Sequence, residues 1–395
     1  MKASSSRVTF PISKAGVSMK VNVGIVTFPL SQAGRIPLLN LVKLFSRLAD
    51  RVYVISGGAA LENLKSYRNV HVAKVTHKLS SNVFMRIINH MHTQLETLRY
   101  VIVEPRRVDL FVFFIGGEGL FIPMLILKLL RKKVVLMPGG VATKGYFVRK
   151  DPLFKFMSML VSLNFSLADK LIVYSHRLIQ EANLAKYQRK IIIAHEHFVD
   201  FARFAIKKKV DKRSNLVGYI GRLSEEKGIL NLIEAVPFVL KGRVDTRFVI
   251  CGEGSLFNEI ENIIKAEGVE AHVRLMRWIA HEDVPQYLNE LRLLVLPSFT
   301  EGLPNVILEA MACGTPVLVM PVGAVPDIIE DGETGFLLKS DDSGHIADRI
   351  VELLGKPELL EKVSVNAYNY VRENFSYEKT LEAWRKILEQ LKITN

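Results

Sequence analysis

Strand-like apolar runs alternate with helix-like runs along almost the whole chain, and this alternation constrains the fold more than any other feature. In the first half it predicts strands at 21–28, 51–56, 110–115, 133–137 and 170–174, with helical spacing at 38–48. In the second half it predicts strands at 216–220, 247–251, 272–276, 293–296, 316–319 and 335–338. Strands that alternate with helices form parallel sheets with helices on both faces. We therefore expect an α/β protein, closed by two helices over 358–391 that are broken near Asn374.

The alternation stops once, between Arg203 and Asn215, in a charged stretch with little apolar periodicity. A chain of 395 residues is too long for one ordinary core, so this stretch predicts a linker between two domains. The predicted division is a disordered extension at 1–20, a first domain at 21–205, a linker at 206–214, a second domain at 215–375 and a tail helix at 376–395. In doubly wound sheets, ligands bind beyond the carboxyl ends of the strands. Two such domains would face each other across a cleft that holds two substrates.

Charge is distributed unequally between the two halves. Residues 1–210 carry 33 lysines and arginines against 11 aspartates and glutamates, a net charge of +22, whereas 211–395 carry 20 against 29, a net charge of −9. This asymmetry indicates that the first half faces an anionic partner, either nucleic acid or an acidic membrane surface. No segment is long and apolar enough to span a bilayer. The two cysteines, Cys251 and Cys313, lie in apolar contexts typical of buried thiols, which favours a reducing, cytoplasmic compartment.

Four loops of the second domain follow predicted strands and therefore lie where a ligand would bind. The first contains Gly221, which permits a tight turn, and the cations Arg222 and Lys227 just before a helix. Arginine binds phosphate as a planar fork and lysine as a point charge, so this pair suits a diphosphate. A solvated surface loop with ordinary charges is the alternative, and this loop alone does not decide between the two.

The second and third loops carry weaker signals. Gly252, Glu253 and Gly254 follow a strand, where glycines let a ligand approach the backbone, although a plain strand-to-helix turn explains them equally well. Trp278 and Ile279, together with His281, follow the next strand, where an aromatic ring and backbone amides could read a nucleobase. Packing of the tryptophan within its own domain is an equal alternative.

The fourth loop leads into a helix and carries two carboxylates, Glu301 and Glu309. Pro304 suits the first turn of this helix and Gly314 its end, so the amides of 305–307 are expected to be free to bind an anion. One carboxylate can accept hydrogen bonds from sugar hydroxyls and the other from a ribose diol. The apolar neighbours of Glu309 indicate a buried helix, so this carboxylate should have a polar partner.

Together these loops resemble those of family 4 glycosyltransferases. The resemblance rests on Gly221-Arg222 with Lys227-Gly228, on Gly252-Glu253-Gly254, and on the glutamate pair at 301 and 309, and it extends to the Asp-Gly-Glu-Thr-Gly-Phe-Leu run at 331–337. It covers nearly all of 215–340. Several motifs in one order and at one spacing are far more specific than any of them alone. The resemblance implies the GT-B fold, in which two Rossmann-like domains face a cleft and the C-terminal helix crosses back to the first domain.

The resemblance gives a role to each matching residue. Arg222 and Lys227 would hold the donor diphosphate and stabilise the leaving group, and Glu301 would contact the donor sugar as the third catalytic residue. Glu309 would bind the ribose. The other predicted donor-binding residues are Gly34, Gly221, Gly252, Glu253, Gly254, Trp278, Ile279, Gly302, Leu303, Pro304, Asn305 and Val306. The resemblance also implies retention of anomeric configuration without a divalent metal or cofactor, a UDP- or GDP-sugar being the donor substrate.

The first domain departs from the family pattern, so no catalytic residue is assigned in it. The family's histidine after the strand that ends at Met137 is absent, and its Asn-Gly-Val-Asp motif is replaced by His197-Phe198-Val199-Asp200. The N-terminal glycine-rich loop is reduced to Ala33-Gly34-Arg35. Glu118 could lie in the cleft, but an exposed loop carboxylate is the favoured interpretation.

The leading hypothesis is a glycosyltransferase whose basic first domain meets a lipid or lipid-linked glycan acceptor on the cytoplasmic face of a membrane. The apolar run 153–165 lies beside Arg149, Lys150 and Lys155 and could lie in the membrane interface, with Lys128 and 131–133 extending the basic surface; a buried core helix is the alternative. A GT-B phosphorylase or nucleotide-sugar epimerase is the second hypothesis. A nucleic-acid-binding protein is the third, but no helix-turn-helix, zinc-finger or RNP-like signature is present, so we expect no nucleic-acid partner.

Overall fold

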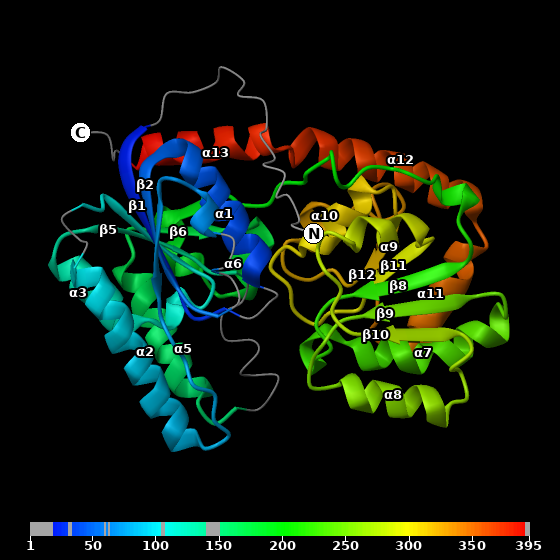
Figure 1. The fold of residues 1–395 in the computed structure, drawn as a ribbon. Coiled ribbons are helices and arrows are strands. Elements are labelled where there is room, and N and C mark those ends of the chain that lie inside the picture. The colour runs from blue at the N-terminus through cyan, green and yellow to red at the C-terminus, as the bar shows by residue number, and fades with distance from the viewer. Residues whose placement is uncertain are drawn as a thin grey trace, which may run out of the picture.

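Two parallel sheets, each covered by helices, make up the molecule. The computed structural model describes residues 19–30, 34–58, 61, 64–103, 107–139 and 151–391. The first sheet lies on the left of Figure 1 and the second on the right. The prediction of an α/β protein built from two doubly wound sheets is confirmed. Of the predicted extension and tail helix, residues 1–18 and 392–395 lie outside the described residues.

The first sheet has seven strands in the order β3-β2-β1-β4-β5-β6-β7. They are β1 (Met19–Thr27), β2 (Ala49–Ser56), β3 (Val70–Lys74), β4 (Leu110–Phe114), β5 (Lys133–Met137), β6 (Lys170–Val173) and β7 (Ile191–Ile193). The helices are α1 (Arg35–Leu48), α2 (Val83–Val103), α3 (Phe121–Leu129), α5 (Phe154–Leu167) and α6 (His176–Glu181). All five residues of β4 are buried because helices cover both faces of the sheet. The strand order reverses between β1 and β4, which opens a crevice for a ligand there.

The second sheet has six strands in the order β10-β9-β8-β11-β12-β13. They are β8 (Leu216–Ile220), β9 (Arg247–Cys251), β10 (Val273–Met276), β11 (Leu293–Leu296), β12 (Val317–Val319) and β13 (Phe336–Leu337). The helices are α7 (Ile229–Gly242), α8 (Phe257–Ala266), α9 (Val284–Glu290), α10 (Asn305–Ala312) and α11 (Ser343–Leu354). Here the strand order reverses between β8 and β11. The loops that follow these two strands carry the strongest predicted motifs.

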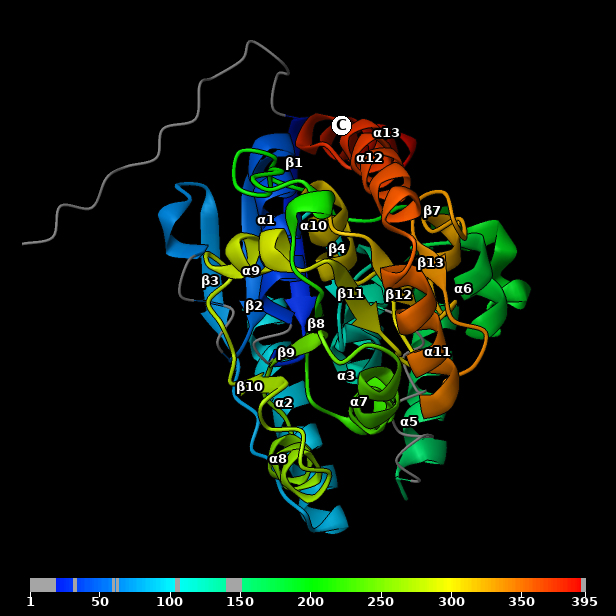
Figure 2. The same cartoon turned by 90° about the vertical axis from the view of Figure 1, so that its right-hand side faces the viewer.

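Two helices at the end of the chain join the domains. Figures 1 and 2 show α12 (Pro357–Asn374) and α13 (Tyr377–Gln390) running one after the other along one side of the molecule. The break between them is fixed by Ser376, whose hydroxyl accepts a hydrogen bond from the amide of Lys379 at 3.3 Å and so caps α13. The buried Trp384 packs edge-on against Phe45 of α1, with ring centroids 5.0 Å apart. The C-terminal helix therefore crosses back to the first domain.

The apolar run at 153–165 forms most of α5, and neither predicted alternative describes it alone. Met157, Leu160, Val161 and Phe165 are buried in the domain, whereas Phe156, Met159 and Leu163 are exposed. Within the described residues, every helix is too short or too polar to cross a bilayer.

Candidate functional site

The carboxyl ends of both sheets open into one shared cavity of about 750 Å³. This volume falls within the usual range for small-molecule sites. The first domain contributes the residues after β1, β4, β5 and β6, and the second contributes those after β8, β10 and β11. The predicted site residues that line the cavity are Gly34, Gly221, Arg222, Lys227, Trp278, Glu301, Gly302, Leu303, Pro304, Asn305, Val306 and Glu309. The cavity thus brings together most of the residues that the sequence analysis selected, and their roles there stay predictions.

Both predicted phosphate-binding cations lie at the cavity with a carboxylate beside them. Lys227 Nζ lies 2.6 Å from Glu301 Oε1, and Arg222 Nη1 lies 3.1 Å from Glu226 Oε1. The loop turns at Gly228, whose φ is +61° and where a Cβ atom would lie 2.2 Å from the carbonyl oxygen of Pro297. Glycine is therefore required at this point for α7 to start where it does. An anionic ligand that reaches this loop would compete with the two carboxylates for the same cations.

Glu309 is buried on α10 and has the polar partner that its burial demands. Its Oε1 lies 2.7 Å from Nε2 of His281, and the carbonyl of His281 accepts a hydrogen bond of 3.1 Å from Arg203. The sequence analysis placed His281 in the third loop but did not pair it with Glu309, which lies 28 residues away on α10. The burial of the carboxylate predicts that a partner exists, whereas only the fold identifies it.

The N-terminus of α10 differs in one detail from the prediction. Pro304 lies at the N-cap position, and Gly314 follows the helix with a φ of +65°, as expected for its end. The amide of Ile307 donates a hydrogen bond of 3.2 Å to the carbonyl of Pro304. The expectation of three free amides at 305–307 is therefore wrong for Ile307, because the first turn of the helix closes on itself.

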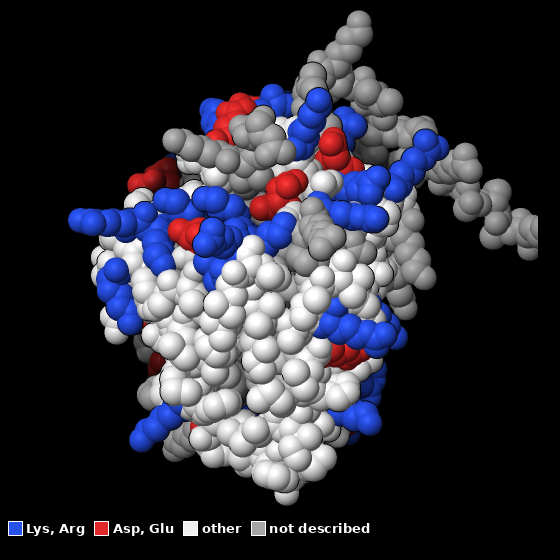
Figure 3. Space-filling model, turned by 90° about the vertical axis from the view of Figure 1, so that its left-hand side faces the viewer, with Lys and Arg blue, Asp and Glu red and all other residues white. Residues whose placement is uncertain are grey.

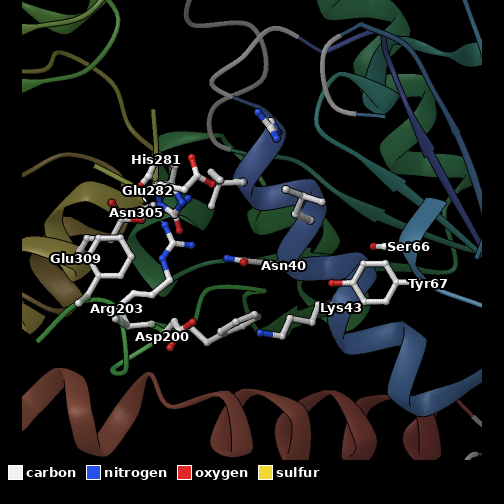
Figure 4. A pocket seen from close by; sticks show the side chains of 16 residues that line it. Asn40, Lys43, Ser66, Tyr67, Asp200, Arg203, His281, Glu282, Asn305 and Glu309 are labelled. Atoms are coloured by element: carbon white, nitrogen blue, oxygen red, sulfur yellow. Dashed lines mark hydrogen bonds and ion pairs between the residues drawn. The ribbon is translucent and has the colours of Figure 1, made fainter. Parts of the chain in front are cut away.

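A smaller cavity of about 410 Å³ reaches Glu309 from the side of α1. Figure 4 looks into it: Asn40 and Lys43 project from α1, and Arg203 extends from the segment that leads out of the first domain. Asn305 and Glu309 line both cavities. The buried carboxylate therefore stands between the main cavity and a second, more polar space.

Four predicted donor-binding residues, Gly252, Glu253, Gly254 and Ile279, lie outside the lining of the main cavity. A Cβ atom at Gly252 would lie 1.8 Å from the carbonyl oxygen of Gly221, and one at Gly254 would lie 2.0 Å from that of Leu223. The loop after β9 therefore packs directly on the loop after β8, and this contact alone requires both glycines. Contact of these four residues with a donor stays a prediction.

Glu118 lies in the wall of the cavity, so its interpretation as an exposed loop carboxylate is wrong. It belongs to a short 3-10 turn at Gly117–Gly119 that follows β4, and Gly116 enters the turn with a φ of +80°. Its Oε2 atom is buried and has no hydrogen-bond partner among the described residues. Burial raises the pKa of this carboxyl.

A buried polar cluster lies behind the first domain's side of the cavity. Tyr174, which lines the cavity, donates a hydrogen bond of 3.1 Å from its hydroxyl to Oε1 of the fully buried Glu196. Burial raises the pKa of Glu196 to about 8 and lowers that of His195 to about 4. Burial also holds the pKa of His197 well below its ordinary value. The cluster is therefore mainly uncharged at neutral pH.

The second domain matches a known protein family. Residues 200–370 match the family model of glycosyl transferases group 1. The second domain is therefore similar to group 1 glycosyltransferases. The matched segment includes the loops with Arg222, Lys227, Glu301 and Glu309.

Several curated relatives match mainly one half of the chain. The α-D-kanosaminyltransferase of Streptomyces kanamyceticus is 33% identical over 187 residues, which are 46% of this chain and 48% of that protein. The chain thus spans about half the length of the first curated relatives that it matches. The N-acetyl-α-D-glucosaminyl L-malate synthase of Bacillus anthracis is 23% identical over 93% of this chain and 97% of its own length.

Solved structures match almost the whole chain. Anabaena HepE, solved with UDP and glucose, has a TM-score of 0.74 at 18% identity, covering 93% of this chain and 99% of its own. Sucrose-phosphate synthase from Thermosynechococcus elongatus has a TM-score of 0.77 at 17% identity, covering 95% of this chain and all of its own. These likenesses establish the fold: the chain adopts the GT-B architecture that the sequence resemblance implied.

Proposed function

We propose that this protein is a retaining, metal-independent glycosyltransferase that moves a sugar from a nucleoside-diphosphate sugar to an acceptor held by the first domain. One observation carries the proposal: Arg222 and Lys227 from the loop after β8, Glu301 from the loop after β11 and Glu309 from α10 line one cavity between two sheets. In this assignment, 215–375 forms the donor side, 21–205 the acceptor side and 206–214 the linker. UDP is the favoured nucleotide, because the similarly folded HepE was solved with UDP and with UDP-glucose.

The proposed reaction requires the site to stabilise the diphosphate as it leaves the sugar. Arg222 and Lys227 are placed to neutralise its developing charge, and the first turn of α10 offers the amides of Asn305 and Val306. Fixed positive groups directed at developing negative charge supply a large share of enzymatic rate enhancement. Two protein cations can supply this charge without a divalent metal. Glu309 is placed to accept hydrogen bonds from the ribose, and Glu301 from the donor sugar.

The acceptor that we propose is a lipid or lipid-linked glycan at the cytoplasmic face of a membrane. The net charge of +22 in residues 1–210 supports an anionic surface as the partner of the acceptor side. A phosphorylase or epimerase on the same fold is not favoured, since the relatives named above are a transferase and a synthase. A nucleic-acid-binding role is not favoured either, because the family match falls mainly on the less basic half.

Substitutions in the donor half test the assignment. Arg222→Ala and Glu309→Gln are each expected to lower kcat/KM by about 10²–10³-fold, the usual effect of removing one group that stabilises the transition state. Release of UDP from the UDP-sugar that gives the largest thermal stabilisation is the measurement. Glu267→Gln, an exposed carboxylate at the end of α8, is the matched control and should retain parental turnover. If both site variants keep parental activity while their melting temperatures are unchanged, the donor-site assignment fails.

Metal independence and stereochemistry are tested separately from residue roles. Turnover is expected to be the same in EDTA and in magnesium, and NMR of the product should show the anomeric configuration of the donor. Loss of turnover in EDTA with recovery in magnesium would refute metal independence. An inverted anomer would refute retention and leave the donor site unaffected.

A further inference from the structure

Helix α2 is amphipathic in the opposite sense to a helix that packs on a protein core. Its large apolar side chains recur at i, i+3, i+4, i+7 and i+11 and are exposed: Phe84, Ile87, Ile88, Met91 and Leu95. Phe84 is 69% exposed and Leu95 is 53% exposed. The buried side chains of the same helix are Thr93, Gln94, Thr97 and Val101. A surface helix of a soluble domain normally shows the reverse arrangement.

Hydrogen bonds hold α2 in this orientation. The Thr93 hydroxyl lies 3.1 Å from the carbonyl of Thr76, and Oε1 of Gln94 accepts a hydrogen bond of 2.8 Å from the amide of Ile122 at the start of α3. Rotating the helix to bury its apolar face would strip these buried polar groups of their partners. The outward apolar face is therefore a fixed feature of the domain.

The apolar face continues beyond α2 onto neighbouring elements. Leu79, before the helix, is 92% exposed, and further exposed apolar side chains lie on α3 and α5: Leu129, Phe156, Met159 and Leu163. Figure 3 views the molecule from this side and shows a broad area with few charged side chains, with Lys and Arg gathered along its upper edge. Contiguous exposed apolar surface of this kind marks a site of interaction with a protein or a membrane.

Exposed cations on these helices and on the segments beside them indicate the partner. Arg99 lies on α2 and Lys155 on α5, whereas Lys78 precedes α2, Arg131 follows α3 and Lys133 begins β5. A symmetric dimer through this face would bring the cations of two copies together, which repel each other. An anionic bilayer instead offers hydrocarbon to the apolar side chains and negative headgroups to the surrounding cations. We propose that the α2 face, formed by exposed residues of α2, α3 and α5, inserts into the interface of an anionic membrane.

The two main helices of the α2 face also hold the acceptor side of the cavity. Nε2 of His90 on α2 lies 3.2 Å from the carbonyl oxygen of Gly119, and Asn164 on α5 donates a hydrogen bond of 2.8 Å to the carbonyl of Glu118. Phe28 in the cavity wall stacks on His90, with ring centroids 5.7 Å apart. A membrane on the α2 face would therefore be connected to the cavity wall through α2 and α5. This step deepens the proposed function and rests on it, since it would deliver a lipid-linked acceptor to that wall.

Co-sedimentation of the full chain with vesicles tests the α2 face. Vesicles of equimolar phosphatidylcholine and phosphatidylglycerol should bind the protein at low salt, with weaker binding at high salt and on phosphatidylcholine alone. The double variant Phe84→Asp, Leu95→Asp should lose roughly tenfold or more in vesicle affinity, because two large apolar side chains no longer enter the interface. The matched control is Phe238→Asp, Val244→Asp, which adds the same charge at exposed apolar positions of the second domain and should bind as the parent does.

Three outcomes would overturn the proposal. The first is a parent protein that stays in the supernatant with anionic vesicles at low salt, and the second is an α2 variant that binds as tightly as its control. The third is a parent that sediments as a dimer without lipid and an α2 variant that is monomeric, which would make the face an interface between copies. Thermal stabilisation by UDP, measured on all variants, reports donor binding alone, so failure of the membrane step is distinguishable from failure of the proposed function.

Discussion

At the scale of single residues, the polar cluster behind the cavity is held in its uncharged form by burial. Glu196 is fully buried, and the hydroxyl of Tyr174 is its hydrogen-bond donor. The pKa of about 8 means that the folded protein keeps a proton on this carboxyl at pH values where an unfolded chain, with an ordinary value of 4.5, has released it. Glu196 therefore makes stability depend on pH.

The sign of this dependence follows from proton linkage. Below pH 4.5 both states are protonated, and the contribution of Glu196 to stability is fully present; it is lost as pH rises through about 8. Stability should therefore fall with rising pH by up to about 1.4 kcal/mol per pH unit in this interval. His195, with a pKa lowered from 6.5 to about 4, acts in the opposite direction but only below pH 6.5. The interval from pH 6.5 to 8 therefore isolates Glu196.

Glu196→Gln should flatten the fall in stability between pH 6.5 and 8. Glutamine keeps an acceptor for the Tyr174 hydroxyl but has no proton to release, so only the pH dependence should change. Urea unfolding at the two pH values is the measurement, with Glu267→Gln as the exposed control that should keep the parental slope. Equal slopes in parent and Glu196→Gln would show that this carboxyl is ionised in the folded state.

Site residues divide into those that a local pattern identifies and those that only the fold identifies. Arg222, Lys227 and Glu301 were selected because cations and carboxylates follow predicted strands, where a parallel sheet places ligands. His281 was noted in the third loop, but its pairing with Glu309 could not be predicted, because that pairing depends on how two distant loops pack. Glu118 was assigned to an exposed loop because a glycine-rich turn gives no sign that helices cover it.

At the scale of elements, α13 is the structure that ties the end of the chain to the first domain. Trp384 contributes to this contact in two ways: its ring packs on Phe45, and its Nε1 donates a hydrogen bond of 2.9 Å to the carbonyl of His195. That carbonyl belongs to the segment beside Glu196. The helix thus supports the back of the cavity and closes the apolar core over α1.

Two substitutions separate the ring of Trp384 from its hydrogen bond. Trp384→Phe keeps most of the packing and should lower the free energy of unfolding by about 1 kcal/mol, the usual value of one hydrogen bond. Trp384→Ala removes the ring and should lower it by about 3–5 kcal/mol. Urea unfolding measures both, and Trp278→Ala at a half-exposed ring is the control for loss of a tryptophan. A Trp384→Ala variant as stable as Trp278→Ala would show that α13 does not stabilise the fold.

The elements themselves were predicted best where burial is complete. The bounds of β5, β8, β9 and β11 agree with the predicted strands to the residue, because each is a short apolar run between clear turn or helix signals. β3 and β7 were not predicted: they form the two edges of the first sheet, where strands are short or partly exposed. α2 was not predicted either. Its regularly spaced apolar side chains face away from the core, whereas the prediction assumes that such side chains are buried.

At the scale of the whole molecule, the two domains meet where the predicted donor-sugar loop touches the first sheet. Gly302 approaches the loop after β5 so closely that a Cβ atom would lie 2.0 Å from the carbonyl oxygen of Gly139 and 2.9 Å from the ring of Tyr174. The amide of Gly323, beside the same loop, donates a hydrogen bond of 3.2 Å to Glu181 of the first domain. Because Gly302 has no side chain, the donor side and the acceptor side can approach this closely.

Gly302→Ala should hold the two domains apart without altering the nucleotide side of the cavity. A separation of about 1 Å between reacting groups can lower the rate about 10²-fold, so we expect kcat to fall by that order. The affinity for UDP should stay close to parental, because Arg222, Lys227 and Glu309 all belong to the second domain. Turnover and UDP titration by calorimetry are the two measurements, and Gly344→Ala in α11, far from the first domain, is the control.

Parental turnover in Gly302→Ala would show that the contact between Gly302 and Gly139 is dispensable. Loss of UDP affinity in step with turnover would instead mean that the methyl group distorts the donor loop itself, which would remove this argument for domain contact.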